Sequence, residues 1–272
     1  MDSTTFTPEV RHLHFNTIYI IESLLKGERR TGKELHQQLK LKSFQYEQLH
    51  PRYEEVQTRK AFVKLLHRIE LQVANGFMPW LHLEIHGGMK GLTFSSGDVL
   101  EWDDLHQHLR RLNKVTGNNL MVSFAACRAA STYFSIDPMV PAPFIGVIAP
   151  FNTVTSREIE EGFSAFFDEL FDSNDIPNAV DALNQGSTPP RFQFLHAEGF
   201  FYMLWGMLEE HYTNPVTYRK RILSTMSQAL GNRNVRNGYS LPDLRYEVEK
   251  YFNPDGREAL RQHYLRAFMM LN

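Results

Sequence analysis

Residues 120–130 read LMVSFAACRAA. The first seven form an apolar run broken only by Ser123, the pattern of a strand that is buried on both faces of a sheet. The only cysteine of the chain, Cys127, follows directly. The stretch therefore predicts a central strand, and it raises the question of whether the thiol behind that strand is inert core or a nucleophile.

Working outward, apolar segments of the same kind recur and alternate with amphipathic ones. Strands are predicted within residues 14–25, 79–88 and 142–150, and a small hairpin with a Ser-Gly-Asp turn within 89–100. Helices are predicted at 31–41, 58–76, 101–117, 156–171 and 176–186, with Thr31 and Ser156 as N-caps of two of them. This alternation predicts an α/β fold whose largely parallel central sheet is flanked by helices.

The chain changes character near residues 186–190, GSTPP. Beyond them the segments read as amphipathic helices with no convincing strand. We therefore predict an α/β domain over residues 1–190. A helical extension over 191–272 is expected to pack on it, because its helices carry much aromatic surface.

Composition excludes several classes of protein. The 272 residues carry a net charge of −2, which argues against a nucleic-acid-binding surface or a basic membrane anchor. A lone cysteine cannot form an internal disulfide, and neither a signal peptide nor a long apolar run is evident, so a cytoplasmic protein without membrane contact is expected. His106 and His108 do not share a helical face, and no ligand set for a metal is complete. We expect no cofactor.

Two chemically useful side chains follow apolar strands. His86 follows the strand LHLEI and precedes two glycines, and Cys127 lies 41 residues later (127 minus 86) at the end of the next apolar strand. Catalytic groups gather at the carboxyl ends of parallel strands, and a connection of this length suffices for a right-handed crossover. If the two strands are neighbours, His86 and Cys127 lie side by side.

That arrangement suits nucleophilic catalysis, since an imidazole can activate a thiol and carry its proton to a leaving group. The backbone N–H groups of Gly87 and Cys127 are candidate donors to an oxyanion. The simpler alternatives are that Cys127 is core, as free cysteines often are, and that His86 is a turn residue.

The stretch LHLEIHGG…LMVSFAACRAA resembles the core of caspase-like cysteine peptidases, closest to the CHAT group, which is related to separases and caspases. The shared features are a strand ending in His-Gly, a short hairpin, a helix that begins Trp-x-x-Leu and a strand ending in Ala-Cys. The resemblance covers roughly residues 75–185. It departs from the family after the cysteine, where RAA replaces the usual small or polar residues.

The resemblance implies a caspase-like three-layer fold and a thiol endopeptidase that cleaves a protein or peptide substrate. Cys127 would be the nucleophile, His86 the general acid and base, and the amides of Gly87 and Cys127 the oxyanion hole. It also implies a regulatory protein partner and a place in a bacterial stress or antiviral defence system.

Two acidic residues are candidates for the substrate pocket. Glu84 shares a strand face with His86 and could orient the imidazole or shape a basic pocket; alternatively it is an edge or surface carboxylate. Asp137 follows the nucleophile strand, in the region where the family builds its pocket for the residue before the cleaved bond. The sequence sets no preference for that residue.

Two other functions remain open. The chain could be a caspase-like scaffold that no longer cleaves and acts as a binding or regulatory protein. It could also be a cytosolic hydrolase of small molecules that reached a Cys-His pair independently.

Overall fold

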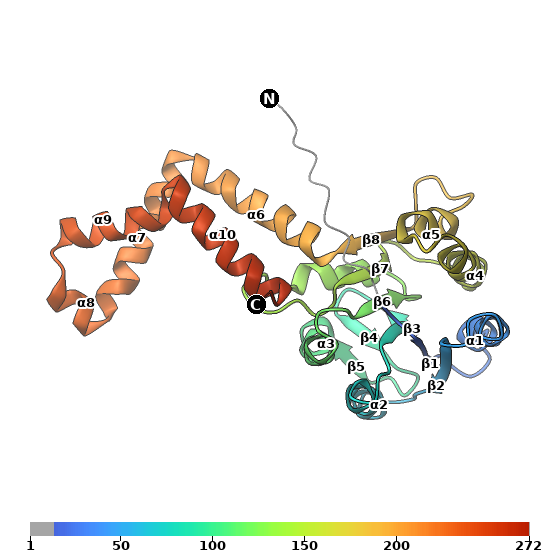
Figure 1. Cartoon of the computed structure of the whole chain (residues 1–272). Coiled ribbons are helices and arrows are strands. Elements are labelled where there is room, and N and C mark those ends of the chain that lie inside the picture. Colours follow the sequence, from blue (N-terminus) through green and yellow to red (C-terminus); the bar gives the residue numbers. More distant parts are fainter. Residues whose placement is uncertain (1–13, 272) are drawn as a thin grey trace. The chain divides into compact units, whose positions relative to one another are not determined.

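The computed structural model describes residues 14–271, which divide into two compact units (Figure 1). The first contains the described residues up to Asp137 together with Pro141–Ala197, and the second contains Pro138–Val140 and the residues from Glu198 onward. The site described below lies entirely within the first unit.

A mostly parallel sheet forms the centre of the first unit. Its strands are β1 (Thr17–Ser23), β2 (His50–Glu55), β3 (Pro79–Gly87), β6 (Met121–Phe124), β7 (Gly146–Pro150) and β8 (Phe192–His196). They lie in the order β2-β1-β3-β6-β7-β8, and only the β7–β8 pair in this path is antiparallel. Strand β2 thus lies on one side of β1, and β3, the next strand along the chain, lies on its other side. Such a change of direction creates a crevice at the carboxyl ends of the strands, where open α/β sheets bind ligands.

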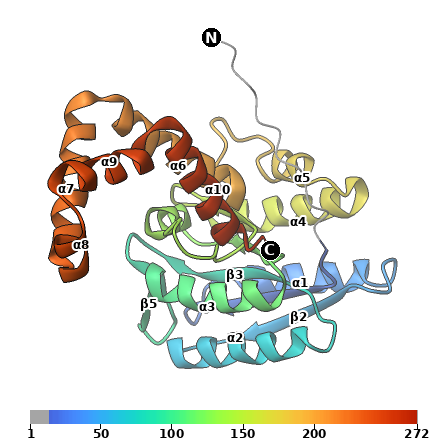
Figure 2. The same cartoon turned by 60° about the vertical axis from the view of Figure 1, so that its left-hand side comes forward.

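Helices flank this sheet on both faces, which confirms the predicted α/β class with a largely parallel central sheet (Figures 1 and 2). Helices α1 (Thr31–Lys42) and α4 (Ser156–Ser173) lie on one face, and α2 (Arg59–Val73) and α3 (Trp102–Val115) lie on the other. On the first face Trp80 of β3 packs its ring 5.7 Å from that of Phe166 in α4. On the second, Trp102 of α3 meets Phe124 of β6 edge-on. Because both faces are covered, β1, β6 and β7 are buried along their whole length, which explains their apolar sequences.

A short hairpin extends from the end of β3, as predicted. Its strands are β4 (Gly91–Thr93) and β5 (Val99–Glu101), and β4 pairs with His86 and Gly87. Helix α5 (Ile176–Leu183) packs against α4 and precedes β8.

The second unit is built from helices α6 (Ala197–Thr213), α7 (Pro215–Gly231), α8 (Arg233–Gly238), α9 (Leu241–Phe252) and α10 (Pro254–Met269). Ile222 of α7 and Leu244, Val248 and Phe252 of α9 form a small core of their own. Helices α6 and α10 lie side by side, joined by the ion pair of Glu209 with Arg257 (Figure 1). Within residues 14–271, no helix has the length and apolar character needed to cross a membrane.

Several local predictions were wrong. Residues 192–196 form β8, although no strand was expected after residue 190. The polar segment 41–58, whose sequence pattern is ambiguous, contains the edge strand β2. Helix α4 is capped by Thr155, which makes a reciprocal capping box with Glu158, and not by Ser156. Helix α1 has Arg30 at its N-cap position, and Thr31 turns its hydroxyl elsewhere.

Candidate active site

The register of the sheet brings His86 and Cys127 to the same level. Parallel strands β3 and β6 pair Trp80 with Met121 and Leu83 with Phe124, an offset of 41 residues (121 minus 80). The same offset relates His86 to Cys127 just beyond the ladder. Trp80, His82 and Ser123 share one face of the sheet, and alternation along β3 places His86 on that face as well. Cys127 lies in the turn after β6 and lines the same pocket as His86. The expectation that these strands are parallel neighbours is confirmed.

Gly87 keeps the two chain segments in close approach. A Cβ atom on Gly87 would lie 2.4 Å from the carbonyl oxygen of Cys127 and 3.1 Å from Cβ of Ala126. No side chain fits at 2.4 Å from a backbone atom, so the approach requires glycine at this position. Gly88 is different, because a Cβ atom there would meet nothing within 4 Å.

A tight turn presents the thiol. Arg128, directly after Cys127, has a φ of 56°, in the left-handed region that non-glycine residues seldom adopt. Its amide donates to Asn152 in the loop after β7, and a 3-10 helix, η1 (Ala129–Ser135), follows. The half-buried thiol of Cys127 donates to the carbonyl of Val154 at 3.7 Å. In the part of the chain that the structure describes, no hydrogen bond joins this thiol to His86, and the Cys127 amide has no acceptor.

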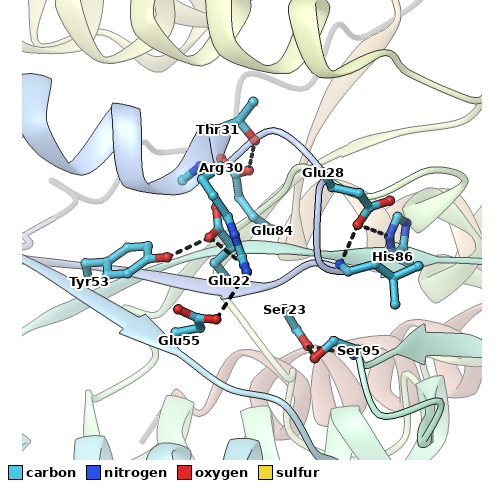
Figure 3. A network of polar contacts seen from close by, with 12 residues as sticks. Glu22, Ser23, Glu28, Arg30, Thr31, Tyr53, Glu55, Glu84, His86 and Ser95 are labelled. Carbon is cyan, nitrogen blue, oxygen red and sulfur yellow. Dashed lines mark hydrogen bonds and ion pairs between the residues drawn. The ribbon is translucent and has the colours of Figure 1, made fainter.

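Glu28 supplies a carboxylate to His86 (Figure 3). Its Oε2 lies 2.9 Å from Nε2 of His86 and accepts the Leu25 amide at 2.5 Å. Partial burial raises the pKa of the Glu28 carboxyl, but the hydrogen bonds from His86 and from Leu25 outweigh it and hold that pKa below its usual value. An acceptor on Nε2 leaves the other ring nitrogen of His86 available for a reacting group.

These elements enclose a pocket of about 110 Å³. Its lining comes from the loop after β1, the end of β3, the turn after β6 and the start of α4, and it includes Glu28, Glu84, His86 and Cys127. The pocket therefore lies at the carboxyl ends of the strands on either side of the β1–β3 switch, where the topology favours a ligand.

Glu84 is buried at 2% exposure and borders this pocket from within the sheet. One oxygen lies 3.1 Å from Nε2 of His82, and the other accepts the hydroxyl of Thr31 (Figure 3). The reading of Glu84 as an edge or surface carboxylate was therefore wrong. The hydroxyl of Thr31 donates its hydrogen bond to Glu84, which explains why it does not cap α1.

The chain Ser123–His82–Glu84 has the hydrogen-bond order of a serine-hydrolase triad. Ser123 Oγ lies 2.8 Å from Nδ1 of His82 and also accepts Nε1–H of Trp80 at 2.9 Å. All three members are buried, with Ser123 and His82 at 0% exposure, so no substrate reaches the hydroxyl. This chain is a buried support for Glu84 rather than a second active site.

A second buried carboxylate, Glu22, lies beside Glu84 in the sheet register. It accepts the Gly32 amide at 3.0 Å, the Tyr53 hydroxyl at 2.6 Å and the Arg30 guanidinium at 3.2 Å. Burial, followed by the hydrogen bond to Glu22, raises the pKa of the Tyr53 phenol. The Glu22 carboxylate thus accepts hydrogen bonds from three donors, and one of them, the guanidinium of Arg30, is cationic.

The structure brings together most of the residues predicted for the site, but not all of them. His86, Gly87, Cys127 and Glu84 meet at the pocket, whereas Asp137 does not line it and lies near Arg110. Glu28 was missed, and the only available signal was its place in the loop directly after the first strand. Among residues 14–271, no three histidine, cysteine or acidic side chains form a group able to hold a metal ion.

No protein-family model matches the chain, and no curated protein is similar to it in sequence. The family suggested by the sequence motifs consequently rests on those motifs and on the geometry of the pocket.

Proposed function

We propose that this chain is a caspase-like cysteine endopeptidase of the CHAT type. The observation that carries the proposal is the common pocket of His86 and Cys127, set by the shared offset of 41 residues in β3 and β6 and by the close approach of Gly87. The remaining support is the resemblance of residues 75–185 to that family.

In the proposed reaction, the Cys127 sulfur attacks the carbonyl carbon of the substrate while His86 takes the thiol proton. The negative charge that develops on the carbonyl oxygen is met by the amides of Cys127 and Gly87. His86 then gives its proton to the leaving amine, and water, deprotonated by His86, hydrolyses the thioester. Glu28 holds the imidazole through Nε2 during both proton transfers.

The thiol hydrogen bond to Val154 is compatible with this mechanism. Catalytic hydrogen bonds often form only when substrate is bound, so their absence in the free protein does not disqualify a pair. A sulfur held by a single weak bond at 3.7 Å can turn toward a bound carbonyl at small cost.

The size of the pocket favours a peptide over a small-molecule substrate. A volume of about 110 Å³ is well below the roughly 300–1,000 Å³ of pockets that enclose drug-sized ligands. It is enough for one amino-acid side chain, and the rest of an extended peptide would lie outside it. This argues against the hydrolase of small molecules.

The scaffold without activity is the second candidate, and the same thiol bond to Val154 is the observation in its favour. In either case we propose a cytoplasmic protein with a regulatory partner, acting in bacterial stress or antiviral defence, as the resemblance implies.

Labelling with peptidyl acyloxymethyl ketones tests the proposal. These probes alkylate a cysteine only when a peptidase site positions and activates it. We expect mass spectrometry to find the label on Cys127 in the native protein and to find little in His86→Ala, with Cys127→Ala as the blank. A native Cys127 that reacts no faster than free cysteine would favour the scaffold.

A further inference from the structure

The two buried carboxylates beside the pocket differ in their counter-charges. Glu22 and Glu84 are register partners on β1 and β3, with 0% and 2% exposure. Glu22 pairs with the guanidinium of Arg30 at 3.2 Å. For Glu84, no lysine or arginine partner occurs in the described part of the chain, and its one ion-pair candidate is His82. Burying a carboxylate without a counter-charge is costly.

The hydrogen-bond order around His82 makes it a neutral donor. Ser123 accepts the indole N–H of Trp80, and its own hydroxyl has two acceptors within reach, Nδ1 of His82 at 2.8 Å and the Leu81 carbonyl at 3.5 Å. The much shorter distance favours donation to Nδ1. With Nδ1 as an acceptor, the single proton of the imidazole is on Nε2 and points at Glu84, 3.1 Å away. Thr31 is a second neutral donor. In the described part of the chain, the side-chain hydrogen bonds to Glu84 therefore come from neutral groups, and Glu84 lines the pocket.

The other charged residues around the pocket do not neutralise the carboxylate of Glu84. Arg29 also lines the pocket, but its guanidinium pairs with Glu34 at 3.3 Å and with Glu160 at 2.6 Å. Glu28, at the more exposed end, adds a second carboxylate. The net field inside the pocket thus attracts cations.

Part of the pocket lining is apolar, and it includes Leu24, Val154 and Ile159. A pocket with a partly apolar lining and a buried carboxylate matches a side chain that has an alkyl chain ending in a cationic group. A pocket of about 110 Å³ has room for one such side chain.

We propose that this pocket binds the side chain of a lysine or arginine residue and that Glu84 is its counter-ion. Because Cys127 and His86 line the same pocket, the basic residue is the one whose carbonyl Cys127 attacks. Only this last step rests on the proposed endopeptidase activity; the affinity of the pocket for a cation does not.

The first experiment needs no catalysis. Iodoacetamide alkylates Cys127, and a ligand in the pocket shields it. We expect butylguanidine and butylammonium to slow alkylation of the native protein about tenfold at saturation, while butylurea, which is uncharged, and valerate, which is anionic, leave the rate unchanged. Equal protection by butylurea, or no protection by either cation, would overturn the inference.

The second experiment compares acyloxymethyl ketone probes that differ only in the residue next to the reactive ketone. Lysine and arginine probes should label Cys127 about 10- to 100-fold faster than a norleucine probe, and an aspartate probe slowest. In Glu84→Gln the preference for the basic probes should fall to within a few-fold of norleucine. Glu22→Gln is the matched control, since Glu22 is equally buried and adjacent but does not line the pocket, and it should keep the preference.

The two proposals fail in different ways. Protection by butylguanidine without labelling by any peptidyl probe would keep the cation pocket and reject the endopeptidase. Labelling that is fastest with norleucine or aspartate would keep the endopeptidase and reject the cation pocket. The native protein alone decides both, even if Glu84→Gln does not fold.

Discussion

Glu28 Oε2 lies 2.9 Å from Nε2 of His86; Glu28 comes from the loop after β1, and His86 from the end of the neighbouring strand β3. The carboxylate fixes one nitrogen of the imidazole and so determines which nitrogen faces the pocket. In the endopeptidase mechanism that we propose, the order carboxylate, imidazole, thiol would be that of a catalytic triad, with Glu28 as the positioning residue.

We expect Glu28→Gln to lower the peptidase activity or the labelling rate of Cys127 about 10- to 100-fold, because small errors in the placement of a catalytic group have effects of that size. Since the pKa of Glu28 lies below the usual 4.5, the carboxylate is ionised throughout the neutral range, and the loss should be equal at pH 6 and pH 8. Rates measured at both pH values check this.

The control for Glu28 is Glu34→Gln, which removes a nearby carboxylate that pairs with Arg29 and does not touch His86. It should retain the native rate. If both variants lose activity alike, the cause is the charge of the region and not the orientation of His86.

We expect Gly87→Ala to destabilise the protein by about 1–3 kcal/mol and to slow alkylation of Cys127, because the new Cβ must push the Cys127 carbonyl away from 2.4 Å. Gly88→Ala is the matched control, since its Cβ would meet nothing within 4 Å. Urea unfolding and alkylation rates measured on both variants check this. Equal stability and equal rates in the two would contradict the close approach.

The proximity of His86 and Cys127 could be predicted because it depends on strong signals. Buried strands have continuous apolar sequences, and catalytic groups gather at their carboxyl ends. Neither signal reveals the register, so the agreement between the spacing of 41 and the strand offset emerges only from the structure.

The role of Glu28 and the burial of Glu84 could not be predicted, for different reasons. Glu28 lies in a loop without periodicity, and its partner is 58 residues away in the sequence. Glu84 resembled a surface carboxylate because alternation along a strand does not tell a covered face from an exposed one. Helix α1 brings Thr31 over the sheet, and Thr31 and His82 together supply the hydrogen bonds that make the burial of Glu84 tolerable.

We expect Thr31→Val to destabilise the fold by roughly 1.5–3 kcal/mol, since it removes a hydroxyl donor from the buried carboxylate of Glu84 and adds no new contact. Thr31→Ser keeps the hydroxyl and should stay close to the native stability. Urea unfolding of both variants separates the contribution of the Thr31 hydroxyl to stability from that of its methyl group. A loss in Thr31→Ser without a loss in Thr31→Val would mean that the methyl group of Thr31, and not its hydroxyl, matters.

His106 joins α3 to η1, the segment that follows Cys127. Its Nε2 lies 2.6 Å from the Thr132 hydroxyl, and Nδ1 lies 3.3 Å from that of Ser135. Burial lowers the pKa of this imidazole from 6.5 to about 4. The folded protein therefore holds His106 neutral at a pH where the unfolded chain has already protonated it.

This difference predicts a specific loss of stability in mild acid. The contribution of His106 is complete above pH 6.5 and is lost as the pH falls from 6.5 toward about 4, because the unfolded state gains its proton first. The full loss is roughly 3 kcal/mol. Urea unfolding at pH 7, 6 and 5 should show a steep decline that His106→Gln flattens, since glutamine does not titrate. His67→Gln, on the exposed face of α2, should leave the decline as it is in the native protein. A pH dependence that His106→Gln does not change would show that other groups cause it.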